Sequence, residues 1–331
     1  MIVRRVLGLG AVAALALSTV ACGGDAKPQS AASRKVRVAL SAASAETLLI
    51  PYGVANGIFK DHGLDVDWTV LNPGTLAIAG LVSGDINIAQ VAAPTGENAI
   101  VQGANLEIIA VPLHHILFAL VARPGITSVK DLAGKVIAIS GPGTPTDLFA
   151  AELLRDAGLD PETDVEMRTM GSGPERIAAM VAGQADATIV GLPSVANAVA
   201  KAGGSVLVDL SKSDIAWPFM SLAVDKGYAA KNNTLIVDFL KAFVESIKRF
   251  KTDSEGAQKV IAKETNQPDP VLVADGYKLF VDLLDETPAP EVQESQRVLD
   301  IIAITEPKAK DFKVERLFNT TYIDEALKST G

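Results

Sequence analysis

Six short segments of small residues offer the chemistry of a binding site. Each follows a predicted strand, and four of the six precede a predicted helix, so the small side chains leave backbone N–H groups accessible where helix N-termini point. Such amides, together with nearby hydroxyls, can hold the polar or anionic groups of a small ligand. The candidate binding residues in these segments are Ser41, Ala42, Glu46, Gly74, Thr75, Gln90, Ala92, Ala93, Ser140, Gly141, Gly143, Thr144, Gly171, Ser172, Gly191 and Leu192.

Two of these segments also fit a structural role. Thr144 with Asp147, and Ser172 with Glu175, have the spacing of a capping box, in which a hydroxyl and an acid three residues later cap a helix. We therefore expect both acids to be structural. The glycines alone would also fit simple turns, but glycine-rich segments that open helices in both halves of the chain favour a ligand cradle.

The segments carry no lysine or arginine. A charged anion would then be held by helix N-termini and hydroxyls alone. An amine, if the ligand has one, would be accepted by Glu46 or Glu97. Outside the segments, His114 is a candidate hydrogen-bond donor, and Trp217 either stacks on an organic ligand or packs between two lobes.

Catalytic and metal-binding patterns are weak in this sequence. His114 and His115 are adjacent in a predicted strand, so their side chains point to opposite faces and cannot share a metal ion. The chain has no Gly-x-Ser-x-Gly elbow, no Walker motif and no complete dinucleotide fingerprint. We expect a non-enzyme without metal or cofactor; the alternative is a secreted enzyme on a bilobal fold, acting on a pyrimidine or an ester.

Alternating strands and helices position the six segments. The pattern predicts strands at residues 36–40, 64–68 and 86–91, and helices at about 46–59 and 73–82. The same unit recurs as strands at 135–140, 165–169 and 187–190, with helices at 145–157 and 174–181. This alternation indicates two α/β units, each with a mainly parallel sheet.

Two strand-like stretches join the units. Residues 115–122 lead from the first unit to the second, and residues 218–224 lead back; four amphipathic helices then follow, at about 235–250, 255–264, 271–285 and 291–302. We expect an α/β protein with two Rossmann-like lobes joined by two crossover segments and closing about a hinge. Lobe 1 comprises residues 35–122 and 217–331, and lobe 2 comprises residues 123–216.

The N-terminus has the pattern of an export signal. Arg4 and Arg5 precede an apolar run at residues 6–20 that is too short to span a bilayer, which predicts a signal peptide at residues 1–21. Cys22, the only cysteine, stands where a bacterial lipobox would place the lipidated residue, with a flexible tether at 22–34. Thr19 departs from the aliphatic residue usual in that motif, so ordinary cleavage near Ala21 is the alternative to lipidation.

Charge and cysteine content narrow the class of protein. Without Arg4 and Arg5 the chain has 28 basic and 39 acidic residues, a formal charge near −11, and no basic run, so nucleic acid is not an expected partner. A lone cysteine allows no intramolecular disulfide. We expect an exported monomer that is held at a membrane by lipid on Cys22 and faces the periplasm or the cell exterior.

Several segments in order resemble one family of transport proteins. They are residues 36–40, residues 51–66, the Gly84-Asp85 turn, residues 130–135 and the turn from Gly183 to Asp186. This set is similar to the nitrate/sulfonate/taurine and thiamine-pyrimidine-precursor group of periplasmic binding proteins, over about residues 35–250. The resemblance implies a type II periplasmic-binding fold and an ATP-binding-cassette (ABC) permease with its ATPase as partners. The ligand it implies first is an alkanesulfonate or taurine, with nitrate-like anions, a hydroxymethylpyrimidine or an aromatic carboxylate as alternatives.

Overall fold

The computed structural model describes residues 34–192, 199, 202–212 and 216–328, whose strands form two five-stranded sheets. The predicted signal peptide and Cys22 lie outside these residues. In the described part of the chain, no helix has both the length and the apolar character needed to cross a membrane.

The first sheet has the strand order β2-β1-β3-β10-β4. Its strands are β1 (Arg34–Leu40), β2 (Leu64–Val70), β3 (Ile88–Ala92), β4 (Leu106–His115) and β10 (Ala216–Asp225). β1 lies between β2 and β3 and runs parallel to both, so the carboxyl ends of these three strands share one edge. β10 is antiparallel to β3 and β4.

The second sheet repeats this plan with the order β7-β6-β8-β5-β9. Its strands are β5 (Phe118–Ala122), β6 (Val136–Ile139), β7 (Glu166–Thr169), β8 (Ala187–Gly191) and β9 (Ser205–Asp209). β6 runs parallel to β7 and β8, whereas β5 is antiparallel to β8 and β9. Each sheet therefore has four strands that run in one direction and one antiparallel strand inserted between two of them, β10 in the first sheet and β5 in the second.

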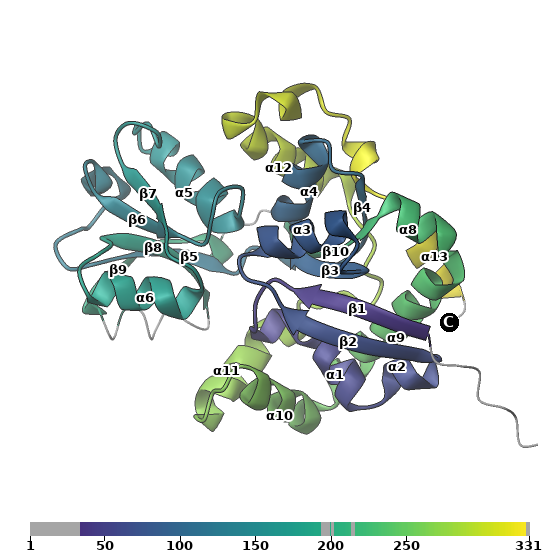
Figure 1. Ribbon diagram of the computed structural model, residues 1–331. Helices are drawn as coiled ribbons and strands as arrows, with labels where there is room; N and C mark the ends of the chain where they lie inside the picture. The colour runs from purple at the N-terminus through teal and green to yellow at the C-terminus, as the bar shows by residue number, and fades with distance from the viewer. Residues whose placement is uncertain (1–33, 193–198, 200–201, 213–215, 329–331) are drawn as a thin grey trace, which may run out of the picture. The chain divides into compact units, whose positions relative to one another are not determined.

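Helices cover the faces of both sheets (Figure 1). The helices between β1 and β4 are α1 (Leu49–Ala55), α2 (Ile58–Asp61), α3 (Gly74–Ser83) and α4 (Ala93–Val101). α5 (Pro145–Asp156) and α6 (Gly173–Val181) lie on opposite faces of the second sheet (Figure 1). The C-terminal part contributes α8 (Lys226–Lys231), α9 (Asn233–Thr252), α10 (Ser254–Glu264), α11 (Pro270–Val281), α12 (Val292–Thr305) and α13 (Thr321–Lys328).

One sequence-based expectation about the sheets is confirmed and one is wrong. Each sheet is mainly parallel, as expected, because four of its five strands run in one direction; only β10 and β5 are antiparallel to their neighbours. The stretch from His115 to Ala122 is not one strand: β4 ends at His115 in the first sheet and β5 begins at Phe118 in the second. An apolar run cannot reveal such a change of sheet, since both strands are buried.

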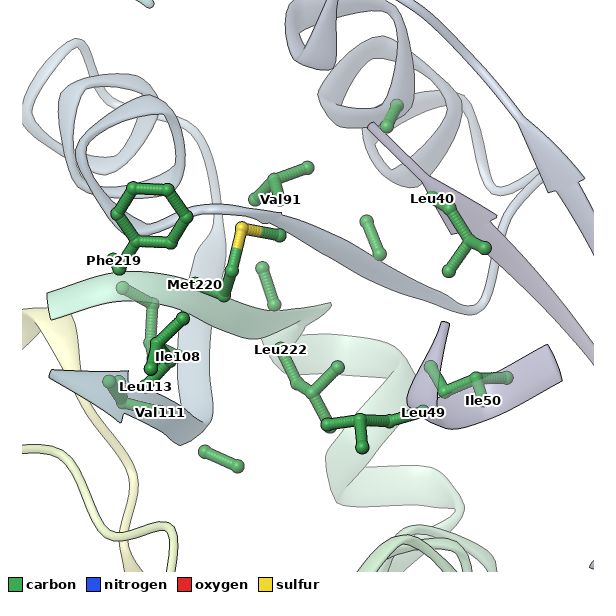
Figure 2. Packing of buried hydrophobic residues seen from close by; sticks show 14 of the residues in the cluster. Leu40, Leu49, Ile50, Val91, Ile108, Val111, Leu113, Phe219, Met220 and Leu222 are labelled. Carbon is green, nitrogen blue, oxygen red and sulfur yellow. The ribbon is translucent and has the colours of Figure 1, made fainter. Parts of the chain in front are cut away.

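One hydrophobic core extends through both sheets. It contains Val38 and Leu222 of the first sheet together with Leu120 and Ile137 of the second. Figure 2 shows part of it, with Val91 of β3, Leu113 of β4 and Leu222 of β10 among the buried side chains. Residues 33–331 accordingly form one compact unit, and the lobe boundaries at residues 122–123 and 216–217 remain a prediction.

Candidate functional site

The three segments after β1, β2 and β3 meet at one edge of the first sheet. Ser41 N–H donates to Gln90 O at 2.9 Å, which ties the first segment to the third. A Cβ atom placed on Gly74 would lie 3.2 Å from Ser41 Cβ and 3.6 Å from Thr95 Cγ2. The sheet thus brings Ser41, Gly74 and Gln90 together as the sequence predicts, because parallel strands end on the same side.

Four buried polar atoms of the described residues lack hydrogen-bond partners, and two of them, Asn72 Oδ1 and Gln90 Oε1, belong to the segments at this edge. The other two, Glu97 Oε2 and His114 Nε2, belong to residues that contact α12. Gln90 is 0% exposed, and its Nε2 donates only a long bond of 3.3 Å to Glu46 O. Buried polar groups in proteins are almost always paired, so each such group calls for an explanation, and a ligand is one. Asn72 follows the end of β2 and belongs to the same predicted segment as the candidate residues Gly74 and Thr75.

The hydroxyls after β6 are already hydrogen-bonded to one another. Ser140 Oγ lies 2.9 Å from both Thr144 Oγ1 and Thr146 Oγ1, and Thr144 Oγ1 donates to Gly141 O at 2.6 Å. The capping box expected for Thr144 and Asp147 is absent, because the Thr144 hydroxyl is used in this way. Asp147 Oδ2 instead accepts from Gly143 N–H at 2.7 Å. This acid therefore has a structural role, as expected, but its partner is Gly143 rather than Thr144.

The segment after β7 forms the predicted capping box. Ser172 N–H donates to Glu175 Oε2 at 2.6 Å, and Ser172 Oγ donates to the same atom at 2.7 Å. These two bonds lower the pKa of Glu175 below its ordinary value. The segment also contacts a residue that the sequence analysis did not consider: Arg176 in the first turn of α6, which donates to Gly171 O at 2.6 Å.

Segments of the two sheets face each other at close range. A Cβ atom placed on Gly143 would lie 2.5 Å from Asn98 Nδ2 of α4. A Cβ atom placed on Gly141 would lie 3.6 Å from Pro73 Cγ. Gly143 also has a φ of +70°, a conformation that favours glycine. The glycines after β6 therefore allow this segment to approach α4 and the segment after β2.

Trp217 lies within an aromatic group at the point where the chain changes sheets. Its ring centroid is 4.9 Å from that of Phe149 on α5, and Phe118 of β5 contacts both Phe149 and Phe219, at 6.0 and 5.1 Å. Trp217 is 1% exposed. Packing between elements of the two sheets is its role in this conformation, and stacking on a ligand would require the ring to be uncovered.

His114 faces the C-terminal helices. Its Nδ1 lies 2.6 Å from Glu294 Oε2 of α12, and its Nε2 lies 3.9 Å from Asp285 Oδ2. Burial lowers the pKa of His114, but the hydrogen bond and charge of Glu294 oppose this effect, and the pKa is raised overall. His115 is exposed, as expected for the opposite face of the strand.

Glu97 joins α4 to the same helix. It is 0% exposed, its Oε1 accepts from Ser295 Oγ at 2.7 Å, and burial raises its pKa to about 8. A neutral Glu97 carboxyl is therefore the main form at pH 7. Glu46, the other candidate amine acceptor, is half-buried and accepts from Ser44 Oγ at 2.7 Å; burial raises its pKa as well.

The remaining predicted site residues lie where their strands end. Ala92 is the last residue of β3 and Ala93 the first of α4, while Thr75 is exposed in the first turn of α3. Gly191 ends β8, and Leu192 N–H donates to Leu117 O at 2.9 Å. A cavity of about 500 Å³ lies elsewhere, between α10 and α11, and none of the predicted site residues lines it. The described residues contain no cluster of His, Cys, Asp and Glu that could hold a metal ion.

Comparison with known sequences identifies related proteins. The sequence model of a family described as NMT1/THI5 like matches residues 47–257. The taurine-binding periplasmic protein of Escherichia coli (strain K12) is 30% identical over 202 residues, which cover 58% of this chain and 59% of that protein. The match therefore spans less than two thirds of the relative's length.

Solved structures share the fold. A protein from Bordetella bronchiseptica superposes with a TM-score of 0.78 at 20% identity, covering 91% of this chain and 98% of the other. The alkanesulfonate-binding protein SsuA from Xanthomonas axonopodis pv. citri, bound to MOPS, gives 0.68 at 16% identity, with 89% and 98% covered. The two sheets and their helices thus form the periplasmic-binding-protein fold.

Proposed function

The chain belongs to the NMT1/THI5-like family, and from this premise we propose that it is the solute-binding component of an ABC importer. Its ligand is a small organic anion, with an alkanesulfonate or taurine as the first candidate. The ligand is held between the segments that follow β1–β3 and those that follow β6–β8. The protein binds and releases this ligand without chemical change.

One observation carries this proposal: Asn72 Oδ1 and Gln90 Oε1 are buried, lack partners, and belong to the edge that the glycines after β6 approach. In periplasmic-type α/β folds, ligands bind outside the carboxyl ends of the strands. A ligand that donates hydrogen bonds to these two oxygens would pair groups that are otherwise buried at a cost. The segments with Ser41, Gly74 and Ser140 would surround it.

The choice of a sulfonate rests on the relatives. The sequence relative is a taurine-binding protein, and one structural neighbour is an alkanesulfonate-binding protein that holds MOPS, itself a sulfonate. Taurine combines a sulfonate with an ammonium group, and Glu46, whose backbone O accepts from Gln90 Nε2, is a candidate acceptor for that ammonium through its half-buried carboxyl. This arrangement favours taurine over a sulfonate without an amine.

A thermal-shift screen tests the ligand class. A ligand that binds only the folded chain raises its melting temperature in proportion to the logarithm of its concentration above Kd. We expect taurine and short alkanesulfonates to raise it more than nitrate, a hydroxymethylpyrimidine or benzoate. A rise with the pyrimidine or benzoate alone would replace the sulfonate by that ligand class, and conversion of any ligand to a product would favour an enzyme instead.

Hinge closure is the motion expected of this proposal. The chain leaves the first sheet after β4 and returns to it in β10, so rotation near residues 113–117 and 216–221 would move the second sheet against the first. Solution scattering with saturating ligand should give a smaller radius of gyration than without ligand. An unchanged profile at saturation would contradict closure.

The membrane anchor and the transport partner are further parts of the proposal. Lipid on Cys22 would hold the protein beside a permease and its ATPase at the outer face of a membrane. Replacing Cys22 by Ala should leave the protein exported and folded but move it from the membrane fraction to the soluble fraction. A variant that stays in the membrane fraction with unchanged mass would contradict lipidation.

A further inference from the structure

Arg176 is a buried cation beside two of the candidate binding segments. It lies in the first turn of α6 and is 5% exposed. Its Nη1 donates to Gly171 O at 2.6 Å, its Nη2 to Ile189 O at 3.1 Å, and its Nε to Thr188 Oγ1 at 3.2 Å. The guanidinium therefore connects the segment after β7 with the end of β8.

In the described part of the chain, Arg176 forms no ion pair with a carboxylate, and its three hydrogen-bond acceptors are uncharged. The adjacent Glu175 is exposed, and its carboxylate accepts both hydrogen bonds from Ser172. The charge of Glu175 therefore acts on Arg176 without direct contact. Burial lowers the pKa of Arg176 to about 10, so the side chain still carries its charge at neutral pH.

A structural role alone does not account for a charge at this place. Buried charges are costly unless they are paired, and a cation near a helix N-terminus also opposes the helix dipole. The positive charge is explained if a negative group occupies the neighbouring space when the protein is loaded.

We propose that Arg176 is a specificity-determining residue that selects an anionic ligand and orients it, its buried charge drawing the negative group toward the segments with Gly171 and Gly191. This inference rests on the proposed function and assigns the orientation of the ligand within the same site. Hydrogen-bond donors of the ligand, such as the ammonium of taurine, then face Asn72 and Gln90. The charge acts at short range through a protein interior, where screening by water is weak. It supplies the cation that the six segments themselves lack.

The test compares two probes of equal shape and different charge, ethanesulfonate and ethanesulfonamide. Their affinities are measured by calorimetry for the wild type, Arg176→Met and Arg176→Lys. We expect the preference for the sulfonate to fall at least tenfold in Arg176→Met and to be kept in large part in Arg176→Lys. Arg168→Met is the matched control, because Arg168 is exposed on β7 and is paired with Glu166 at 2.6 Å. Its preference should equal that of the wild type.

Other outcomes separate this inference from the proposed function. If both probes lose affinity equally in Arg176→Met, Arg176 supports the segments mechanically and the inference is overturned, while the proposed function stands. If Arg176→Met does not fold, Arg176→Gln, which keeps hydrogen-bonding capacity without charge, takes its place with the same expected loss. If the wild type binds neither probe, the sulfonate assignment fails. The role of Arg176 is then tested by the rise in melting temperature that sodium sulfate causes at fixed ionic strength. A smaller rise in the Arg176 variant than in Arg168→Met supports the inference, and an equal rise overturns it.

Discussion

The two edges that face each other differ in how their polar groups are used. At the edge of the first sheet, Asn72 Oδ1 and Gln90 Oε1 are buried without partners. At the edge of the second sheet, Ser140 is bonded to Thr144, and the N–H of Gly143 is taken by Asp147. The first edge therefore has free hydrogen-bond acceptors that a ligand can use. At the second edge the polar groups of the segment after β6 are already paired, and this edge contributes glycines that allow close approach and the charge of Arg176. Substitutions at the first edge should then change affinity, and those within the hydroxyl network of the second should change stability.

The largest expected effect concerns pH and the buried carboxyl behind the first edge. The pKa of Glu97 is about 8 in the folded chain and near 4.5 when exposed, so unfolding releases its proton in this range. The free energy of unfolding should fall as pH rises from 4.5 to 8, by up to about 1.4 kcal/mol per pH unit for this one group. The raised pKa of His114 acts in the same direction, because its contribution is lost as pH rises through that pKa.

Urea unfolding of Glu97→Gln over this range measures the effect. The amide cannot ionise and still accepts from Ser295 Oγ, so the slope of stability against pH should flatten and stability at pH 8 should rise. Glu255→Gln, an exposed carboxylate on α10, is the control and should follow the wild type. A Glu97→Gln profile parallel to that of the wild type would show that Glu97 is charged in the folded protein.

The next largest effect is expected at Gly143. A methyl group there would meet Asn98 Nδ2 at 2.5 Å, so Gly143→Ala should prevent the two edges from approaching and lower affinity about a hundredfold. Gly158→Ala is a matched control: its φ of +81° gives a similar backbone strain, about 1–2 kcal/mol, but nothing lies within 4 Å of the added atom. Equal affinities in the two variants would refute the facing arrangement, and Asn98→Gly should partly restore binding to Gly143→Ala.

A moderate effect is expected at Gln90. Leucine is apolar and removes the unpaired oxygen, so Gln90→Leu should lower affinity about tenfold, which corresponds to the loss of one or two hydrogen bonds. The free energy of unfolding should stay constant or rise, because a buried polar group without a partner is removed. Calorimetry measures the expected loss of affinity, and urea unfolding measures whether the free energy of unfolding stays constant or rises. A loss of stability with affinity kept would assign Gln90 to the core.

The smallest effect is expected at Ser140. Ser140→Ala breaks the bonds to Thr144 and Thr146 and should lower the free energy of unfolding by about 1 kcal/mol. Affinity should change less than threefold, because the hydroxyl is already engaged within its own segment. A large loss of affinity with stability kept would mean that the Ser140 hydroxyl turns toward the ligand, and the contrast between the two edges would be weaker than described.

Much of the architecture was predictable from local patterns. The repeated order of strand, helix and glycine-aspartate turn indicated two α/β units, because period and turn residues are properties of neighbouring residues. The antiparallel entry of β5 and β10 was not predictable, since direction depends on where a strand inserts in a sheet. The break between His115 and Phe118 was also not predictable, because the residues that follow it are as apolar as those of a continuous strand.

The candidate site was predictable as a set of segments but not as a set of contacts. Strand ends located Ser41, Gly74 and Gln90, which the first sheet brings together. Two features depend on partners distant in sequence: the burial of Arg176 against Ile189, and the contact of His114 with Glu294. No spacing in the sequence marks such pairs. The one available signal was the positive charge of Arg176, which follows the segment with Gly171 by a few residues.

A crystal structure with taurine bound tests the central claim most directly. We expect one taurine molecule between the two edges, with its ammonium on Asn72 and Gln90 and its sulfonate toward the segment with Gly171. A ligand found in the cavity between α10 and α11, lined by Ser254 and Lys259, with the two edges unoccupied, would contradict it.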